Sequence, residues 1–211
     1  MRLKKVKNAK ERIEASKYFV SAPEDNISKW QQLFNNSNPI YIEIGMGKGK
    51  FIINMARTYP DINFIGIEKY DSVMVRALNI LKDDENLANL RFVLYDADEI
   101  EKIFNNEIDR IYLNFSDPWP KSKHEKRRLT SKNFLQKYDK VFRGTKEIFQ
   151  KTDNLDFFEF SKNSLVDYGY IIKNLTYDLH SEEIFNIQTE YEERFSEQGV
   201  KINRLEAYKK D

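Results

Sequence analysis

The sequence predicts an α/β fold in which helices cover both faces of a mostly parallel sheet. Short apolar segments alternate along the chain with helical segments of roughly 10 to 15 residues, a pattern typical of βαβ crossovers. A glycine-rich turn follows the first apolar segment, at Gly45–Gly49. The 211 residues suffice for one such domain with a sizeable core. In sheets of this kind, ligands bind beyond the carboxyl ends of the strands.

Residues 1–38 are expected to form a basic arm with short helices, and residues 39–211 the main domain. In the arm, Lys7–Phe19 is expected to be helical, and Ser28 to cap a short helix that ends at Phe34. The expected strands are Ile40–Ile44, Asn63–Ile67, Arg91–Tyr95, Asp109–Phe115, Lys146–Lys151, Tyr170–Leu179 and Val200–Tyr208. The expected helices are Phe51–Tyr59, Asp71–Leu81, Asp98–Phe104, Ser131–Phe142, Asn154–Tyr168 and Ile184–Phe195. The last strands should close the sheet, with one antiparallel strand among them.

Composition excludes several classes of protein. Hydrophobic residues make up 40% and charged residues 33% of the chain, which indicates a globular domain rather than a disordered one. There is no apolar run of about 20 residues that could span a membrane, and the basic N-terminus lacks the apolar core of a secretion signal. The absence of cysteine excludes disulfides and thiolate metal sites, so a cytoplasmic location is expected.

The net charge of +1 says little about partners, but basic residues are concentrated in two segments. These segments are Arg2–Arg12 and Lys121–Arg128. Because Coulomb interactions are screened beyond about 8 Å at physiological salt, a neutral protein can still present a basic face to a phosphate backbone.

The glycine-rich turn indicates a nucleoside-containing cofactor. A dinucleotide site would have the pattern G-x-G-x-x-G, but Gly49 lies one position too early and Lys50 occupies the expected place. Glu43, just inside the end of the strand, would also lie poorly beside a pyrophosphate. S-adenosylmethionine has no phosphate, and its ammonium and sulfonium groups suit a nearby carboxylate.

Two further acids follow the next two strands. Glu68 is placed to accept both hydroxyls of a ribose, and Asp96 to accept an adenine amine. The alternative is that the glycines form an ordinary tight turn and the acids cap helices. Three acids at the ends of three consecutive strands are rarely needed for stability, so the sequence favours S-adenosylmethionine.

The loop after the fourth strand carries Asp117 between Ser116 and Pro118. Prolines on both sides of Trp119 stiffen this loop. A carboxylate suits the N1–H and N2–H₂ edge of guanine and leaves N7 on the far side, while Trp119 would stack on a base or simply pack. The basic segment Lys121–Arg128 that follows is either a solvated loop or a clamp for RNA phosphates.

Two motifs, Phe115–Lys121 and His124–Thr130, resemble the signature of the bacterial tRNA (guanine-N7-)-methyltransferase family, which modifies the variable-loop guanosine. The likeness continues at Lys151–Asn154 and Thr189–Phe195. It implies a Rossmann-like class I methyltransferase fold, with S-adenosylmethionine as cofactor and tRNA as partner. It implies no metal and no membrane, and it leaves open whether the chain acts as a monomer or as a homodimer.

The motifs and the resemblance together assign three groups of site residues. Cofactor contacts are expected from Glu43, Gly45, Gly47, Glu68, Asp96 and Asp117. Guanosine contacts are expected from Lys121, Asp153, Thr189, Glu190, Tyr191 and Glu192. RNA contacts are expected from Lys123, His124, Glu125, Lys126, Arg127 and Arg128.

Asp117 is the expected catalytic residue, although not as a general base. Guanine N7 has an exposed lone pair and no proton to lose, so direct displacement at the methyl group suffices, and most of the rate enhancement should come from positioning. Asp117 would face the positive charge that develops on the purine, while Asp153 and Glu192 would hold its donor edge. As an alternative, Asp153–Asn154 could merely cap a helix, and Thr189–Glu193 could be a solvated helical face.

Three other functions remain open from the sequence. The Asp-Pro-Trp loop resembles the Asp-Pro-Pro-Tyr loop of methyltransferases that modify amino groups of DNA or protein. An NAD-dependent dehydrogenase is a second alternative, although the misplaced third glycine argues against it, and fluorescence titration with NADH would detect it. A non-catalytic RNA-binding protein that keeps the fold is the third, and it would retain tRNA without transferring label from the cofactor.

Overall fold

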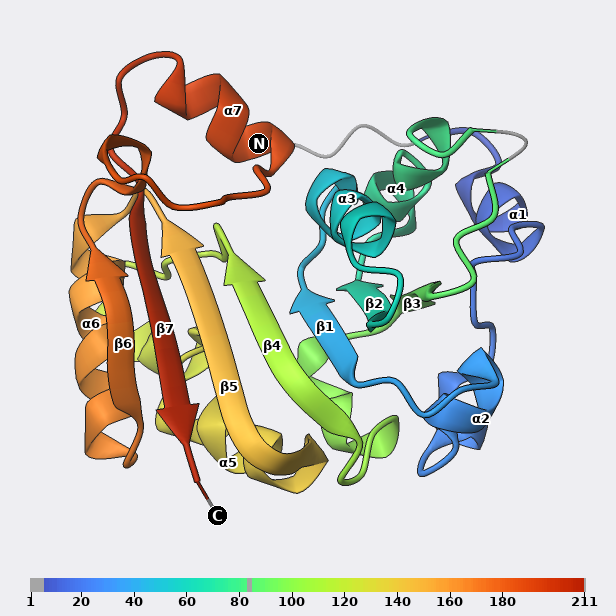
Figure 1. Cartoon of the computed structure of the whole chain (residues 1–211), viewed down its shortest axis with the longest axis horizontal. Coiled ribbons are helices and arrows are strands. Elements are labelled where there is room, and N and C mark those ends of the chain that lie inside the picture. The colour runs from blue at the N-terminus through green and yellow to red at the C-terminus, as the bar shows by residue number, and fades with distance from the viewer. Residues whose placement is uncertain (1–5, 83–84, 211) are drawn as a thin grey trace.

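The computed structural model describes residues 6–82 and 85–210, and within them one sheet of seven strands forms the centre of the molecule (Figure 1). The first residues of the expected basic arm, 1–5, lie outside the described residues. The strand order is β3-β2-β1-β4-β5-β7-β6. The strands are β1 (Ile40–Ile44), β2 (Asn63–Glu68), β3 (Leu90–Leu94), β4 (Ile108–Asn114), β5 (Phe142–Thr152), β6 (Ile171–Thr176) and β7 (Asn203–Lys209).

The pairing confirms the mostly parallel sheet. Strands β1 to β5 pair in parallel, and β7 is inserted antiparallel to both β5 and β6. The reversed direction of β7 is visible in Figure 1, where its arrow points away from the edge at which the others end. The closing antiparallel strand predicted from the sequence is therefore present.

Helices cover the two faces of the sheet unequally. In Figure 1, α1, α3 and α4 lie in front of the β1–β2–β3 half, α5 and α6 lie behind the other half, and α7 crosses the ends of the strands. The α-helices are α1 (Ala9–Glu14), α2 (Trp30–Phe34), α3 (Lys50–Thr58), α4 (Asp71–Met74), α5 (Lys132–Val141), α6 (Leu155–Asp167) and α7 (Glu190–Ser196). Among the described residues, no helix combines the length and apolar character that crossing a bilayer requires.

Alternation along the strands sends side chains to two cores. On β1, Ile42 and Ile44 belong to the core shared with α5 and α6, while Tyr41 packs with the aromatic core beside α3. Tyr112 on β4 and Phe149 on β5 face the same way as Tyr41. Successive residues of a strand point to opposite faces, so a parallel strand covered on both faces is mostly apolar, and β1 is apolar except for the buried Glu43 near its end.

Several local predictions were wrong at element ends. Ser28 does not cap α2, because it has a positive φ of 61° and Lys29 holds the N-cap position. The expected helix over Asp71–Leu81 is broken into α4 and a 3₁₀ turn at Ala77–Asn79, where the chain packs closely against Gly49.

The two ends of the chain also depart from the expected helices. The predicted helix Lys7–Phe19 is confined to α1, because the following residues pair with β3: the amide of Phe92 donates to Tyr18 O at 2.7 Å, and Val20 N donates to Phe92 O at 3.0 Å. The predicted helix Ile184–Phe195 starts only at α7, and residues 184–189 form an extended strap before it. Tertiary contacts thus override local helical tendency in both places.

Glu107 performs the capping that Ser28 was expected to perform. Its Oε2 accepts the amide of Ser28 at 2.8 Å, and its Oε1 accepts the amide of Trp30 at 3.1 Å. The indole of Trp30 is fully buried and donates to Ile103 O at 2.7 Å. One carboxylate therefore fixes the start of α2 and the large side chain that anchors it.

We expect Glu107→Ala to lower the free energy of unfolding by about 1–2 kcal/mol, because the first amides of α2 lose their acceptor. Urea unfolding measures this change. The matched control is Glu101→Ala, which removes a partly exposed partner of Lys140 and should cost less than about 0.5 kcal/mol. Equal losses in the two variants would contradict the capping role.

Candidate active site

The acids predicted to bind the cofactor lie along one edge of the sheet. Strands β1, β2 and β3 are parallel and in register, with Glu43 opposite Gly66 and Glu68 opposite Leu94. Asp96 follows the end of β3, and β4 ends beside β1. The carboxyl ends of parallel strands share one edge, so these side chains are brought together there.

The glycine turn is open on its outer side. Gly45 and Gly47 have φ values of 77° and 58°, and a Cβ added to either would meet no atom within 4 Å. At Gly49, in contrast, a Cβ would lie 2.8 Å from the Cβ of Ala77. The first two glycines therefore leave room for a ligand beside the backbone, whereas Gly49 allows close packing of the chain.

Glu68 fastens this turn to β2. Its Oε2 accepts the amide of Gly47 at 3.2 Å, and its Oε1 accepts the amides of Lys69 at 2.9 Å and Tyr70 at 3.1 Å. Burial raises the pKa of the Glu68 carboxyl, and these three amides oppose the shift. Glu68 thus fixes the conformation of the glycine turn and of the start of α4.

Glu43 is a buried acid with an unsatisfied oxygen. Its Oε1 accepts a hydrogen bond from Asn114 Nδ2 at 2.8 Å, while Oε2 has no protein partner. Burial raises the pKa of Glu43 to about 8, against the opposing effects of Asn114 and Lys151. The hydroxyl of Ser116, at the end of the neighbouring strand, is also buried without a partner. Unsatisfied buried polar atoms are costly and call for an explanation, which a polar ligand would supply.

Asp96 caps a helix with one carboxylate oxygen and is exposed to solvent. It is the N-cap of the 3₁₀ helix Ala97–Lys102, and its Oδ1 accepts the amide of Asp98 at 3.0 Å. The side chain is exposed, and its capping hydrogen bond uses Oδ1. The capping alternative therefore holds for Asp96 without excluding ligand contact.

The loop that carries Asp117 is held in an unusual conformation. Phe115 and Trp119 have positive φ values of 52° and 42°, which cost of order 1–3 kcal/mol each for such residues. Arg128 braces the loop, donating from Nε to Pro118 O at 3.0 Å and from Nη2 to Trp119 O at 3.2 Å. Asp117 is exposed at the tip of this braced loop.

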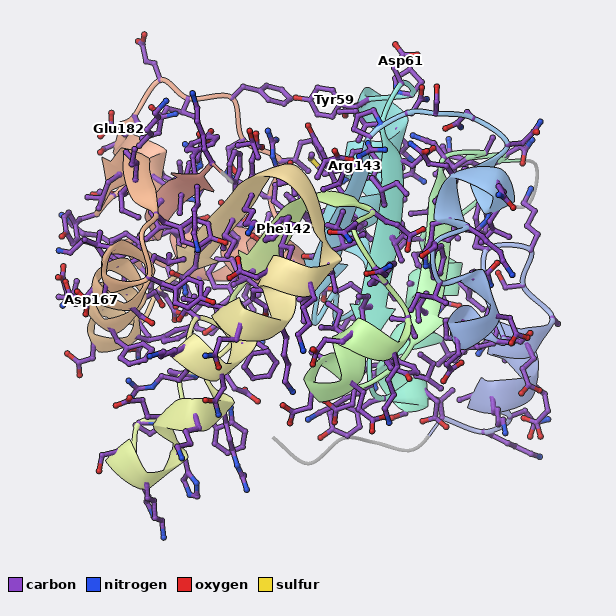
Figure 2. The ribbon with its side chains drawn as sticks, turned by 90° about the horizontal axis from the view of Figure 1, so that it is seen from below. Tyr59, Asp61, Phe142, Arg143, Asp167 and Glu182 are labelled. Atoms are coloured by element: carbon purple, nitrogen blue, oxygen red, sulfur yellow. The ribbon has the colours of Figure 1, made fainter. Side chains whose placement is uncertain are left out.

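The basic segment forms a 3₁₀ helix at Ser122–Arg127 that projects from the body of the molecule beside α5 (Figure 2). Its cations are not equivalent. Arg128 is half-buried, and its guanidinium is hydrogen-bonded to carbonyls of the loop. The guanidinium of Arg127 lies 4.9 Å from the ring centroid of Trp119. The exposed cations in and beside this helix are Lys121, Lys123, Lys126 and Arg127. His124 packs edge-on against Trp119, and Glu125 is exposed.

Helix α7 closes the other side of the site. The hydroxyl of Tyr191 donates to Asp153 Oδ2 at 2.9 Å, and its ring lies 4.9 Å from that of Phe115. Two ion pairs, Lys48–Glu190 and Lys50–Glu193, join α7 to the glycine turn. Helix α7 therefore meets the glycine turn, the residue that follows β5 and Phe115, at the start of the loop that carries Asp117.

The segment Thr189–Glu193 is not a uniformly solvated helical face. Thr189 and Glu192 form a capping box, and Glu192 is fully buried. Its Oε2 accepts from Lys151 Nζ at 2.6 Å, and its Oε1 accepts from Asn186 Nδ2 at 2.6 Å. Asn154 does cap α6, accepting the amide of Phe157 at 2.8 Å, which leaves its neighbour Asp153 available to Tyr191.

Sequence reasoning did not single out Asn114 or Lys151 as individual site residues. Both are buried at the carboxyl ends of strands, where they contact Glu43 and Glu192. The available signal was a polar residue closing an apolar strand, which is unusual unless it is paired. Among the described residues, no cluster of three or more His, Asp or Glu side chains is arranged to hold a metal ion.

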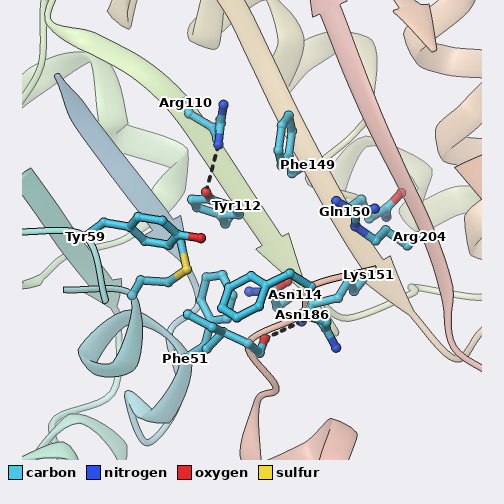
Figure 3. A pocket seen from close by; sticks show the side chains of 13 residues that line it. Phe51, Tyr59, Arg110, Tyr112, Asn114, Phe149, Gln150, Lys151, Asn186 and Arg204 are labelled. Atoms are coloured by element: carbon cyan, nitrogen blue, oxygen red, sulfur yellow. Dashed lines mark hydrogen bonds between the residues drawn. The ribbon is translucent and has the colours of Figure 1, made fainter. Parts of the chain in front are cut away.

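A cavity of about 220 Å³ opens on the sheet face below the strap. Figure 3 shows Arg110, Tyr112 and Phe149 at its upper part and Phe51, Asn114, Lys151 and Asn186 at the lower part, near the strand ends. The cavity adjoins the crevice through Asn114 and Lys151 and does not include the glycine turn.

Comparison with known proteins agrees with this geometry. Residues 37–205 match the family described as "Putative methyltransferase". The chain is 49% identical to the tRNA (guanine-N(7)-)-methyltransferase of Lachnoclostridium phytofermentans, over 99% of each chain.

Solved methyltransferases share the fold. An antibiotic-related methyltransferase matches 87% of this chain and 94% of its own, at 19% identity and a TM-score of 0.66. A 16S rRNA (adenine(1408)-N(1))-methyltransferase from Catenulisporales acidiphilia, solved with cosubstrate SAM, matches 87% and 91%, at 14% identity and a TM-score of 0.61. The expected Rossmann-like class I methyltransferase fold is confirmed.

We expect Glu43→Gln to become more stable relative to the wild type as the pH rises from about 5 to 8. The folded pKa of about 8 exceeds the ordinary value of 4.5, so the folded state keeps a proton that the unfolded state loses. The wild type therefore loses stability across this window, by as much as about 1.4 kcal/mol per pH unit, and the neutral amide does not. Thermal unfolding at both pH values measures the difference, and an unchanged gap in melting temperature would refute the buried-acid assignment.

Proposed function

The chain belongs to the tRNA (guanine-N7-)-methyltransferase family, and from this premise we propose that it transfers the methyl group of S-adenosylmethionine to N7 of a guanosine in the variable loop of tRNA. Family membership favours this activity over the dehydrogenase and over methylation of amino groups. The observation that carries the assignment of the site is the row of acids at the ends of β1, β2 and β3, facing an open glycine turn.

The residues at this edge fit S-adenosylmethionine. Gly45 and Gly47 leave space beside the turn, and the free oxygen of Glu43 and the hydroxyl of Ser116 lack partners that a polar, cationic ligand would provide. Glu68 would accept ribose hydroxyls. When bound, the cofactor supplies an electrophilic methyl group on its sulfonium.

Asp96 would accept the adenine amine, and Asp117 would complete the cofactor side of the crevice. A neighbour of the same fold was solved with cosubstrate SAM, which supports a nucleoside cofactor for this fold.

The substrate side is proposed to hold the guanine by its donor edge. Asp153 and Tyr191 are already joined by a hydrogen bond, and Tyr191 and Phe115 offer adjacent aromatic rings. Asp117 would face the positive charge that forms on the purine, and Lys121 would contact the nucleotide. Guanine N7 needs no base to remove a proton, so the side chains act by orientation and by electrostatic stabilisation.

The predicted site residues in and next to α7 are proposed to have two different roles. Glu190 and Thr189 are proposed to contact the substrate, Glu190 from an exposed position at the start of α7 and Thr189 from the N-cap. Glu192 has protein partners at both carboxylate oxygens, so we assign it to holding the segment in place instead of binding guanine directly.

The proposed RNA contacts lie on the projecting basic helix. Lys123, Lys126 and Arg127 are exposed and would neutralise phosphates, and His124 and Glu125 flank them. Arg128 would act through the loop it braces. This division follows from burial, since a cation occupied by backbone carbonyls is less available to a phosphate.

The direct test is to incubate the purified chain with unmodified tRNA and methyl-labelled S-adenosylmethionine. Label should enter the tRNA, and aniline cleavage, which is selective for N7-methylguanine, should cut at a variable-loop guanosine. Label in another base, or binding of tRNA without transfer, would overturn the proposed reaction.

We expect Asp117→Ala to lose nearly all turnover while remaining folded, because the exposed carboxylate contributes little to the core. Methyl transfer and thermal unfolding should be measured on the same preparation. Ser122→Ala, an exposed change in the adjoining segment, is the matched control and should retain activity. Wild-type turnover in Asp117→Ala would remove this residue from the mechanism.

Lys126→Ala combined with Arg127→Ala should weaken tRNA binding and flatten its dependence on salt by about 1–2 units of log–log slope, because two phosphate contacts are lost. Binding measured at several salt concentrations gives the slope. Arg128→Ala should instead lower turnover while changing the slope less, because Arg128 supports the loop that carries Asp117. The same slope change in both variants would contradict this division of roles.

A further inference from the structure

Lys151 is a buried cation whose role lies outside the contacts assigned so far. It closes the buried end of β5, with 5% of its surface exposed. Its Nζ donates to Glu192 Oε2 at 2.6 Å, to Asn186 Oδ1 at 3.2 Å and to Ile187 O at 3.0 Å. Three acceptors therefore saturate its three protons, and all three belong to the strap and α7.

The environment of Lys151 makes this pairing important for local structure. Its Nζ also lies 5.0 Å from the ring centroid of Phe51 in α3. Burial lowers the pKa of Lys151, and the neighbouring carboxylates of Glu192 and Glu43 oppose that shift. Removing one partner of a buried ion pair leaves an uncompensated charge, so the strap and α7 cannot leave β5 without a large penalty.

Helix α7 depends on such docking because it has only seven residues. Helices this short are not stable by themselves in water. Two of its ionic contacts, Lys48–Glu190 and Lys50–Glu193, are between partly exposed side chains and contribute little. Glu192 has two basic neighbours: Lys151, and the partly exposed His180, whose Nε2 lies 3.3 Å from Glu192 Oε1. Of these two contacts, Lys151–Glu192 is the one in which both side chains are buried.

The position of α7 determines the substrate side of the site. Tyr191 lies next to Glu192 in the chain. Its hydroxyl donates to Asp153, and its ring packs against that of Phe115. Lys151 lies near the end of β5 and Asp153 directly follows the strand, so the anchor of α7 and the carboxylate that Tyr191 contacts are two residues apart. A shift of α7 would separate Tyr191 from Asp153 directly.

We propose that Lys151 is a positioning residue that holds α7 over the ends of β4 and β5, so that Tyr191 and Asp153 are placed to orient the target base. The proposal rests on the proposed methyl transfer to tRNA. Lys151 acts through Glu192 and the strap and does not touch the reacting atoms. The cofactor crevice along β1, β2 and β3 does not depend on it.

The test compares Lys151→Met with Lys146→Met. Both change a lysine of β5 that is paired with a carboxylate, but Lys146 lies in the middle of the strand, away from α7, and its Nζ is 2.9 Å from Asp139 Oδ1. Two measurements are needed at a temperature where all proteins are folded. The first is hydrogen exchange of peptides covering 184–196 and of peptides covering β4 and β5. The second is kcat with tRNA, together with the KM for each substrate.

In Lys151→Met, exchange should increase over 184–196 but not in β4 or β5, and kcat should fall about 10- to 100-fold, as expected when a base is misplaced. The KM for S-adenosylmethionine should remain near the wild-type value. Lys146→Met should lose stability while keeping wild-type kcat and wild-type exchange over 184–196. Wild-type kcat in folded Lys151→Met, or equal effects of the two variants, would overturn the proposal.

If Lys151→Met does not fold, Lys151→Arg replaces it. The larger planar guanidinium keeps the charge but cannot reproduce the three ammonium contacts, so exchange and kcat should change in the same directions by smaller factors. Wild-type values in both measurements would overturn the proposal. The exchange result tests the placement of α7 even if the wild-type chain does not methylate tRNA, so failure of the proposed function would be recognised separately.

Discussion

The parallel alignment of β1, β2 and β3 is the constraint on which the site depends. Backbone pairing in register brings Glu43, Glu68 and Asp96 to one edge, although about 25 residues separate each from the next along the chain. The crossover helices that make parallel pairing possible also bury the strands, so Glu43 and Glu68 are buried at this edge while Asp96, beyond the end of β3, is exposed. The glycine turn and the loop carrying Asp117 add further residues to an edge whose acids are positioned by the sheet.

The same edge concentrates features that oppose stability. Glu43 is an acid in a buried position with one oxygen unsatisfied, and the hydroxyl of Ser116 lacks a partner. Phe115 and Trp119 are held in a left-handed backbone conformation, with Arg128 bracing the loop. Unfavourable groups persist where the surrounding structure holds them, and such groups cluster at functional sites. The extensive cores on the two faces of the sheet offset these local costs.

Sequence patterns were most successful where a residue's role depends on its neighbours along the chain. The strand Ile40–Ile44 and the turn that follows were placed correctly, because an apolar run and glycines are local signals. Asn154 was correctly considered as a helix cap for the same reason. The capping of α2 was assigned to Ser28, however, whereas Glu107 supplies the acceptor from a segment 77 residues from Trp30. No local pattern could have revealed that contact.

The sequence by itself determined the order of strands and helices along the chain, the glycine-rich turn and the acids at strand ends, since periodicity and glycine spacing reflect the backbone conformation directly. Only the tertiary structure decided which polar residues are free to meet a ligand. It showed that Glu192 accepts hydrogen bonds from Lys151 and Asn186. It also showed that Arg128 donates to the loop that carries Asp117, and that Tyr191 donates to Asp153. The physical reason is that burial and hydrogen-bond satisfaction belong to the packed chain as a whole, because partners dozens of residues away compete for each polar atom.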